Sequence, residues 1–370
     1  NVDKSTTFKP LVNISSSPNT VTGELTGSMS SYGNPTLRWE RTGTWDIGVD
    51  FNLFRGKLYG KFDVYSKHSE DLIADVTLSA VQGTTSMRLN NGEILNRGFE
   101  MEVGSTLRIS PNVTWNGVLT LSYNKNRIKS LQVKPTNAYD LVYVGGSTAW
   151  MEGYDMNTLW TYKYGGLQNV GTASSPDWQP TILHKSGLYE TFATWPTGDP
   201  MDCSYAMGTT VAPWNMSFST SFRVYDFDIS MIVTGKFGHK FLRESFNYPS
   251  VSGRAVPNDK YSEVKNCDPN EMIPLPQNEI ETRYYFWDRF YPYMSYLTES
   301  ASHIRLQEFS VGYNLPKKVV AKIGMKSLQV YAQCNNPFNI YFNGYGEDPE
   351  FAKGTIRLQA SYTFGIKCKF

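Results

Sequence analysis

The sequence alternates apolar and polar residues in steps of two over much of its length. In the first clear segment, residues 45–53, the odd-numbered side chains are apolar and the intervening ones are Asp46, Gly48, Asp50 and Asn52. The same alternation recurs in residues 58–65, 99–109, 113–124, 214–224, 226–237, 328–335 and 356–370. A period of two is that of a β-strand, whose successive side chains point to opposite faces. The chain is therefore predicted to be all-β, with one apolar face on each strand.

The two faces of these strands differ in charge. No apolar-phase position in the eight segments is charged, whereas the opposite positions include Lys61, Glu100 and Glu102. A Lys or Arg facing lipid at the bilayer centre costs about 2–4 kcal/mol, so a charge-free face suits the outside of a membrane barrel. A soluble sandwich core would also exclude charge, but several of these segments are far longer than the ~5–6 residues of an average soluble strand. We therefore predict a transmembrane antiparallel β-barrel, whose tilted strands need about 9–11 residues.

Composition excludes other classes of protein. The chain has 35 basic and 34 acidic residues, a net charge of +1, which argues against nucleic acid as a partner. Aromatic residues make up 14% of the sequence, too many for a disordered tail. Uninterrupted apolar runs stay far below the roughly 18 residues of a transmembrane helix, so a helical membrane protein is not expected.

Loop lengths add to the barrel prediction. Short connections near 54–57, 110–112, 225–226 and a compact 316–326 segment alternate with long excursions near 81–95, 132–153, 243–301 and 337–354. Outer-membrane barrels have short periplasmic turns and long external loops in this order. The 316–326 segment is expected to hold a small amphipathic helix, and a β-bulge is expected at Gln307–Glu308, where the alternation breaks phase.

Neighbouring strands of an antiparallel sheet run in opposite directions. The strands near 154–167 and 214–224 would both run toward the short turns, so one more strand is expected between them, and its weak pattern lies near 182–192. This gives eleven strands in total. Eleven strands that start outside the cell cannot close a bacterial barrel, which has an even number. The chain is therefore expected to be the C-terminal part of a larger barrel. Residues 1–37 are expected to form an external loop, and residues 38–370 the barrel strands.

Six short motifs, in order, resemble one known family. They are Asn34-Pro35-Thr36-Leu37-Arg38-Trp39-Glu40; Asn91-Gly92-Glu93 with Asn96-Arg97-Gly98-Phe99-Glu100; Leu121-Ser122-Tyr123-Asn124-Lys125-Asn126; His303-Ile304-Arg305-Leu306-Gln307-Glu308; Gly312-Tyr313-Asn314-Leu315-Pro316; and Gly344-Tyr345 with Asp348-Pro349-Glu350. The family they resemble is that of the SusC/RagA-like TonB-dependent transporters of Gram-negative bacteria, and the resemblance runs from about residue 34 to the end of the chain.

The resemblance implies the C-terminal half of a 22-stranded barrel in the outer membrane. It also implies TonB-dependent import of an oligosaccharide or oligopeptide, with a SusD-like surface lipoprotein as a lid and pairing of two transporter–lipoprotein units into a dimer. The family's plug domain and TonB box are absent from this sequence, so the TonB complex would act through a preceding segment. The alternatives are a passive outer-membrane porin or structural barrel segment, and a soluble all-β carbohydrate-binding protein.

The segment 283–293 is the strongest candidate for contact with substrate or with the lipoprotein, because aromatic rings stack on sugars and Arg binds hydroxyl or peptide groups. Its candidate residues are Tyr284, Tyr285, Trp287, Arg289, Tyr291 and Tyr293. The alternative is that these rings pack the loop on itself or form the external aromatic girdle. Polar side chains on the inward phase are expected to line the lumen: Glu100, Glu102, Arg108, Arg223 and Arg357.

Several further expectations concern individual residues. Phe370 ends the last strand in phase with the lipid-facing side chains and suits recognition by the outer-membrane assembly machinery. Glu347, Asp348 and Glu350 form an acidic loop that is expected to be solvated, with calcium binding as a weaker alternative. Cys203 and Cys267 could pair, whereas Cys334 and Cys368 are expected near opposite ends of neighbouring strands. No catalytic motif, metal site or cofactor is predicted, since the four histidines are scattered and no C-x-x-C is present.

Overall fold

The computed structural model describes residues 11–31, 33–77, 86–145, 149–169, 172–175, 178–187, 189–191, 196, 198–243, 290–322, 324–351 and 357–370. Nine long strands form one antiparallel sheet in which each strand pairs with the next one along the chain. They are β3 (Arg41–Leu53), β4 (Leu58–Thr77), β5 (Ser86–Ser110), β6 (Val113–Leu131), β12 (Trp214–Val224), β13 (Phe227–Phe237), β16 (His303–Asn314), β17 (Ser327–Tyr341) and β18 (Ser361–Lys369). The predicted all-β, antiparallel class is confirmed.

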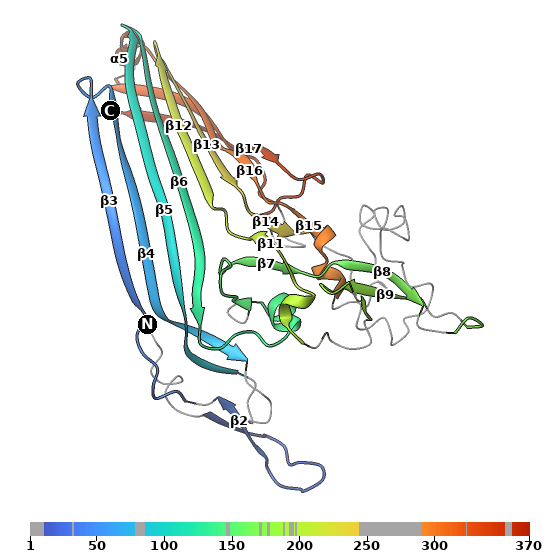
Figure 1. Ribbon diagram of the computed structural model, residues 1–370. Coiled ribbons are helices and arrows are strands. Elements are labelled where there is room, and N and C mark those ends of the chain that lie inside the picture. The colour runs from blue at the N-terminus through green and yellow to red at the C-terminus, as the bar shows by residue number, and fades with distance from the viewer. Residues whose placement is uncertain are drawn as a thin grey trace.

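The connections alternate as predicted. At one end, which we call the short-turn end, tight turns join β3 to β4, β5 to β6 and β12 to β13, and the short helix α5 (Lys317–Lys322) joins β16 to β17. At the long-loop end lie the hairpin of β1 (Leu11–Ile14) and β2 (Gly27–Ser31) and the short strands β7 (Thr158–Thr161), β8 (Tyr164–Asn169), β9 (Trp178–Leu183), β10 (Tyr189–Thr191), β11 (Tyr205–Thr209), β14 (Lys240–Leu242) and β15 (Thr298–Ser300). Figure 1 shows α5 at one end of the sheet and β7, β8, β9 and β11 gathered beyond the other.

The predicted count of eleven sheet strands is wrong for the part of the chain that the structure describes, where the large sheet has nine. β12 pairs with β6 over its whole length, from Trp214 opposite Tyr123 to Val224 opposite Val113, so no strand fits between them. The two extra strands expected near 154–167 and 182–192 fall instead on the short β7–β10, which belong to small sheets. The four residues of β7 and the six of β8 are too few to span a membrane.

Several local predictions are confirmed. Gln307 is an extra residue in β16, since Glu308 pairs with Ile232 and Leu306 pairs with Val233; this is the predicted bulge. Cys334 and Cys368 pair with Tyr362 and Leu328, respectively, six positions apart in the register, and so lie too far apart to bridge. Two loop boundaries were placed wrongly: β5 already begins at Ser86 and β17 continues to Tyr341.

One face of the large sheet is apolar and open. Ile47 is 55% exposed, Phe309 40% and Phe338 58%, on strands from the edge to the interior of the sheet. Aqueous solvent disfavours so large an exposed apolar surface, whereas lipid matches it. No helix among the described residues is long and apolar enough to cross a membrane.

Aromatic side chains form two rows across this apolar face. Toward the long-loop end, the Phe99 ring lies 5.9 Å from Phe62 and 5.8 Å from Trp214. Toward the short-turn end, Trp115 lies 6.4 Å from Phe222. Trp214 and Phe222 are separated by eight residues of β12, about 27 Å along an extended strand. Tilted by about 40°, this spacing corresponds to roughly 20 Å, comparable with the ~25 Å apolar band between the aromatic girdles of membrane barrels.

Candidate functional site

The opposite face of the sheet is polar, and four of the five predicted lumen-wall residues lie on it. Glu102 of β5 pairs with Lys61 of β4, and Glu100 pairs with Asp63. The guanidinium of Arg108 donates to the Pro111 carbonyl oxygen at 3.2 Å. Charges in this number on one face require water or polar partners beside them.

Arg223 and Asp228 are the centre of a polar cluster at the short-turn end of this face. Arg223 Nε donates to Asp228 Oδ1 at 2.8 Å. The other carboxylate oxygen of Asp228 accepts from Asn314 at 2.8 Å and from Gln329 at 3.2 Å. The cluster borders a hollow of about 440 Å³ lined by side chains of β6, β12, β13, β16, β17 and β18. The polar face thus has a structured inner surface and not only scattered charges.

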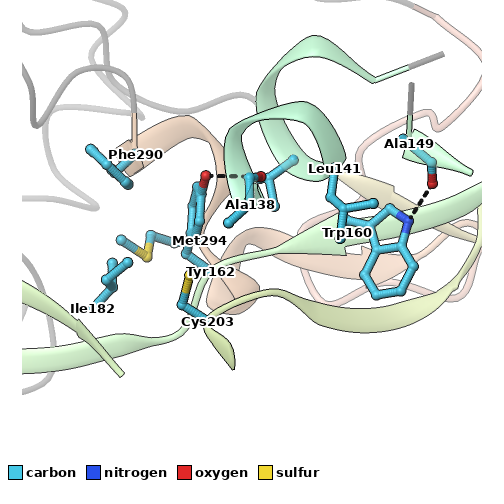
Figure 2. Close-up of a cluster of buried hydrophobic side chains, with 10 residues drawn as sticks. Ala138, Leu141, Ala149, Trp160, Tyr162, Ile182, Cys203, Phe290 and Met294 are labelled. Carbon is cyan, nitrogen blue, oxygen red and sulfur yellow. Dashed lines mark hydrogen bonds between the residues drawn. The ribbon is translucent and has the colours of Figure 1, made fainter. Parts of the chain in front are cut away.

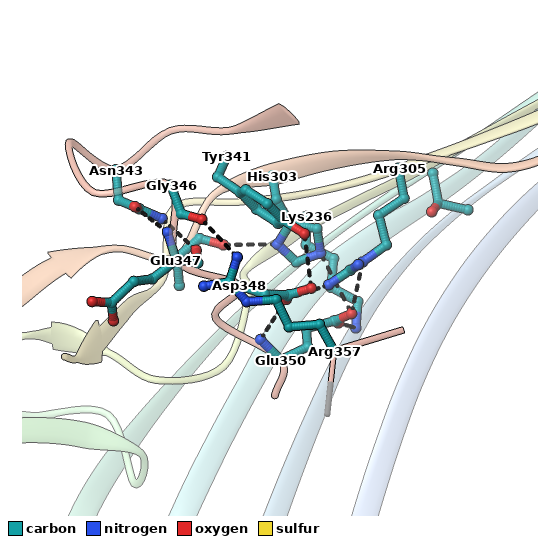
Figure 3. A network of polar contacts seen from close by, with 12 residues as sticks. Lys236, His303, Arg305, Tyr341, Asn343, Gly346, Glu347, Asp348, Glu350 and Arg357 are labelled. Atoms are coloured by element: carbon teal, nitrogen blue, oxygen red, sulfur yellow. Dashed lines mark hydrogen bonds and ion pairs between the residues drawn. The ribbon is translucent and has the colours of Figure 1, made fainter. Parts of the chain in front are cut away.

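At the long-loop end, the loop between β17 and β18 is fastened to the polar face by a buried ion pair (Figure 3). Arg305 of β16 contacts Asp348 with Nη2 2.5 Å from Oδ1, and Glu350 with Nε 3.0 Å from Oε2. Arg305 is 3% exposed and Asp348 6%. We call these three residues and their partners Lys236, His303 and Tyr341 the Arg305 network.

The partners complete the hydrogen bonding of the two carboxylates. Tyr341 Oη donates to Asp348 Oδ2 at 2.9 Å, and Lys236 donates to Glu350. His303 Nδ1 donates to the Ala301 carbonyl oxygen at 2.8 Å and its Nε2 lies 3.6 Å from Glu350. These side chains come from β13, β16 and β17, so the loop lies over three neighbouring strands.

Burial and hydrogen bonding oppose each other in setting the pKa values of the loop carboxylates. Burial alone would raise the pKa of Asp348, but hydrogen bonds from Arg305, the Glu350 N–H and Tyr341 hold it below its usual value. Burial alone would also raise the pKa of Glu350. The hydrogen bond from Lys236 and the charges of Lys236, Arg305 and His303 outweigh burial and lower this pKa. Both carboxylates are therefore ionised at neutral pH.

The acidic loop was expected to be solvated or, as a weaker alternative, to bind calcium. The expectation of a solvated loop is wrong for Asp348, which is buried and ion-paired with Arg305. Glu350 keeps an exposed surface while it pairs with Arg305, and Glu347 lies 3.4 Å from Arg243 Nε. Among the described residues no group of three or more His, Cys, Asp or Glu side chains is placed to hold a metal ion. Arg357, predicted on the lumen wall, precedes β18 and donates to the Gly346 carbonyl oxygen at 3.4 Å, so it belongs with this loop.

Two excursions at the long-loop end fold into one unit with its own apolar core (Figure 2). Tyr162, Phe290 and Met294 have no exposed surface, and Ile182 has 1%. The backbone joins the two excursions: Tyr162 N–H donates to the Tyr293 carbonyl oxygen at 2.9 Å, and Ser295 N–H donates to the Tyr162 carbonyl oxygen at 2.7 Å. We call this unit, residues 138–205 with 290–297, the external module.

Most of the predicted aromatic segment lies outside the described residues. Tyr284, Tyr285, Trp287 and Arg289 fall there, and Tyr291 is described only as backbone, in the 3₁₀ turn Tyr291–Tyr293. Tyr293 is partly buried against the core of the external module. Its ring lies edge-on to Tyr143 at 5.6 Å, and burial raises its pKa.

Sequence reasoning missed two features of this end of the molecule. Tyr139 and Tyr143 stack at 4.8 Å across the π-helical turn Asp140–Val144, and Tyr143 is 39% exposed beside Tyr293. Their i, i+4 spacing was the available signal. The Arg305 network was also missed, although a basic residue on the inward phase and an acidic loop were both visible in the sequence.

The family model and the curated relatives that match this chain are all TonB-dependent receptors. The family model described as TonB dependent receptor-like, beta-barrel matches residues 5–336. TonB-dependent receptor P3 of Formosa agariphila is 26% identical over 341 residues, which cover 87% of this chain and 32% of that protein. TonB-dependent receptor SusC of Bacteroides thetaiotaomicron is 25% identical over 339 residues, covering 87% of this chain and 30% of that protein. The chain thus spans about a third of the length of these curated relatives.

Solved structures share the fold. The RagAB peptide importer in its closed-closed state superposes with a TM-score of 0.70 at 18% identity, covering 98% of this chain and 39% of the other. A second RagAB peptide transporter structure gives a TM-score of 0.69 at 19% identity, covering 98% of this chain and 39% of that one.

Proposed function

The chain belongs to the family of TonB dependent receptor-like β-barrels, and from this premise we propose that it is part of an active importer in the outer membrane of a Gram-negative bacterium. The cargo is a large nutrient, an oligosaccharide or an oligopeptide, and transport depends on TonB. The observation that carries the proposal is the division of the large sheet into an apolar face with two aromatic rows and a polar face. Such a sheet fits a barrel wall between lipid and a water-filled lumen.

The long-loop end supports the proposed partner. A SusD-like lipoprotein closes the external mouth in this proposal, and the external module is a folded surface on that side. The TonB complex acts through the part of the longer protein that precedes this chain, where a plug domain and TonB box are expected. Two transporter–lipoprotein units pair into a dimer.

Substrate contact is proposed for the aromatic residues at the external end. To Tyr284, Tyr285, Trp287, Arg289, Tyr291 and Tyr293 we add Tyr139 and Tyr143, because the exposed Tyr143 ring continues the surface of Tyr293. Such rings stack on sugars and also pack against peptide side chains. Among the matched proteins, RagAB is called a peptide importer, and both cargo classes stay within this proposal. Glu100, Glu102, Arg108 and Arg223 are proposed to line the lumen, and Phe370 to act as the assembly signal.

The first test is purification of the full-length transporter in detergent with everything that remains bound to it. Mass spectrometry should find a lipoprotein and an oligosaccharide or oligopeptide, and thereby name the cargo class. Recovery of the protein in the water-soluble fraction would overturn the membrane placement.

A second test separates active import from passive diffusion. Cells that take up the identified cargo are treated with a proton uncoupler, which removes the energy that TonB delivers. Uptake should stop while the protein stays in the outer membrane. Uptake that continues at the same rate would favour the passive porin alternative.

A Y143A/Y293A variant should lower cargo affinity severalfold, and T172A, which changes an exposed residue elsewhere on the long-loop side, serves as the control.

A further inference from the structure

The charges at the short-turn end are strongly unbalanced, although the whole chain carries a net charge of only +1. The four connections at this end, residues 54–57, 111–112, 225–226 and 315–326, contain a single acid, Asp226. They contain six cations: Arg55, Lys57, Lys317, Lys318, Lys322 and Lys326. We call these six cations the basic rim.

Among the described residues, the cations of the basic rim have no acidic side chain as an ion-pair partner. None of the six cations forms an ion pair with another described residue. Around α5 this follows from the sequence, in which no acid occurs between Glu308 and Glu347. Lys326 is held by structure, since its Nζ donates to the Phe370 main-chain oxygen at 2.9 Å. Lys317, Lys318 and Lys322 are exposed.

Exposed apolar side chains stand directly beside these cations. Phe54, next to Arg55, is 72% exposed, and Val319, next to Lys318, is 49% exposed. Tyr225, in the turn between β12 and β13, is 69% exposed. They lie in the turns and in the helix that end the sheet at its short-turn edge. An apolar group paired with a cation is the arrangement of a surface that enters the lipid headgroup region, where the apolar part is buried and the cation meets phosphate.

We infer that the basic rim, centred on α5, binds the phosphate headgroups of anionic phospholipids in the periplasmic leaflet of the outer membrane. The inference rests on the proposed membrane placement, in which short turns face the periplasm. Lysines beside a bilayer are attracted to anionic lipid within about a Debye length of its surface. The exposed apolar side chains beside the cations favour lipid over a soluble periplasmic protein. The position of the rim at the short-turn end favours phospholipid over the lipid A of the external leaflet.

The test compares two triple variants of the full-length transporter in nanodiscs of phosphatidylglycerol and phosphatidylethanolamine at equal mole fractions. The rim variant is K317Q/K318Q/K322Q, which leaves the bonded Lys326 in place. The control is K129Q/K163Q/K185Q, which removes three exposed lysines at the long-loop end. Native mass spectrometry counts the lipid molecules that each protein retains when released from the nanodisc.

The wild type and the control should retain severalfold more phosphatidylglycerol than phosphatidylethanolamine, and added salt should weaken the preference. The rim variant, which keeps Arg55, Lys57 and Lys326, should show a markedly smaller preference for phosphatidylglycerol. Equal retention by the wild type, or an unchanged preference in the rim variant, overturns the inference. If the rim variant keeps the lipid preference but no longer supports uptake of the cargo, the rim would instead be a binding surface for a periplasmic protein. If the protein needs detergent for extraction, the proposed importer function is retained in each of these cases. A water-soluble protein would overturn both the importer function and the lipid-binding rim.

Discussion

Arg305 and Asp348 form an ion pair with 2.5 Å between Nη2 and Oδ1, although 43 positions separate them in the sequence. The two side chains are 4% and 2% exposed. Such a pair fixes one loop position against the polar face, because neither charge can leave its partner without becoming a buried, unpaired ion.

Replacing Arg305 by Ala should release the loop between β17 and β18. The change leaves Asp348 and Glu350 without their shared cation, and loss of one member of a buried pair costs about 3–5 kcal/mol. Hydrogen–deuterium exchange of peptides covering 343–351 should accelerate strongly, with the β5 and β6 peptides unchanged. The matched control is R223Q, which breaks the Arg223–Asp228 pair, whose Arg side chain is 69% exposed, and should cost less than about 1 kcal/mol. Equal exchange in R305A and wild type would show that the loop is held by other contacts.

The pH dependence of this loop follows from the lowered pKa values of Asp348 and Glu350. A carboxylate whose pKa is lower in the folded state stabilises the fold above its unfolded pKa of about 4, and this stabilisation is lost as the pH falls through the folded value. Exchange protection of the loop should therefore be constant from pH 8 to 5 and fall below about pH 4. In D348N/E350Q the protection should be weaker at neutral pH and no longer change in the acid range. Loss of protection already between pH 6 and 5 would contradict this assignment.

The alternation of apolar and polar residues was sufficient to predict the sheet, its two faces and the bulge at Gln307. Successive side chains of a strand point to opposite faces, so an apolar and a polar environment on the two faces select alternating residue types. It could not count the strands correctly. Trp160, Tyr162 and Tyr164 alternate with polar residues, as in a barrel strand. Gly166 nevertheless adopts a positive φ of 96°, and the segment is divided between two small sheets. The Arg305 network was also beyond sequence periodicity, since it depends on which distant loop residue folds back over β16.

His239 should make the stability of the external end depend on pH between about 6.5 and 4, above the range in which the Asp348 and Glu350 carboxylates act. Burial, with smaller effects of the His303 and Lys236 charges, lowers its pKa from 6.5 to about 4, so it is neutral in the folded protein. As the pH falls from about 6.5 toward 4, the unfolded chain binds a proton that the folded chain does not, which destabilises the fold by at most about 3 kcal/mol. Urea unfolding midpoints should fall over this range in the wild type and less steeply in H239Q. Parallel pH profiles of the two proteins would rule out His239 as the source.

The external module should be destabilised without damage to the barrel strands. Met294 has no exposed surface and packs in the core of the module, so M294A leaves a cavity and should cost about 2–5 kcal/mol there. Limited proteolysis should cut residues 138–205 faster, while the barrel keeps its resistance to unfolding by detergent on unheated gels. Y143A, at a partly exposed ring, is the control and should leave the cleavage rate close to wild type. Loss of the barrel form in M294A would mean that the module and the large sheet fold as one unit.

The assignment of the two faces of the sheet is tested by neighbouring residues of β12. Phe218 lies on the apolar face, paired with Leu119 and Val233, whereas Ser219 points to the polar face. F218K places a charge opposite lipid near the middle of the strand and should cost about 2–4 kcal/mol, whereas S219K adds the same side chain on the lumen side and should be tolerated. The amount of folded protein in the outer membrane, measured from the unheated gel band, should fall sharply for F218K only. Because the two substituted residues are adjacent, the difference between the variants reports the direction of the side chain and not its position along the strand. Equal loss in both variants would contradict a lipid-facing apolar surface.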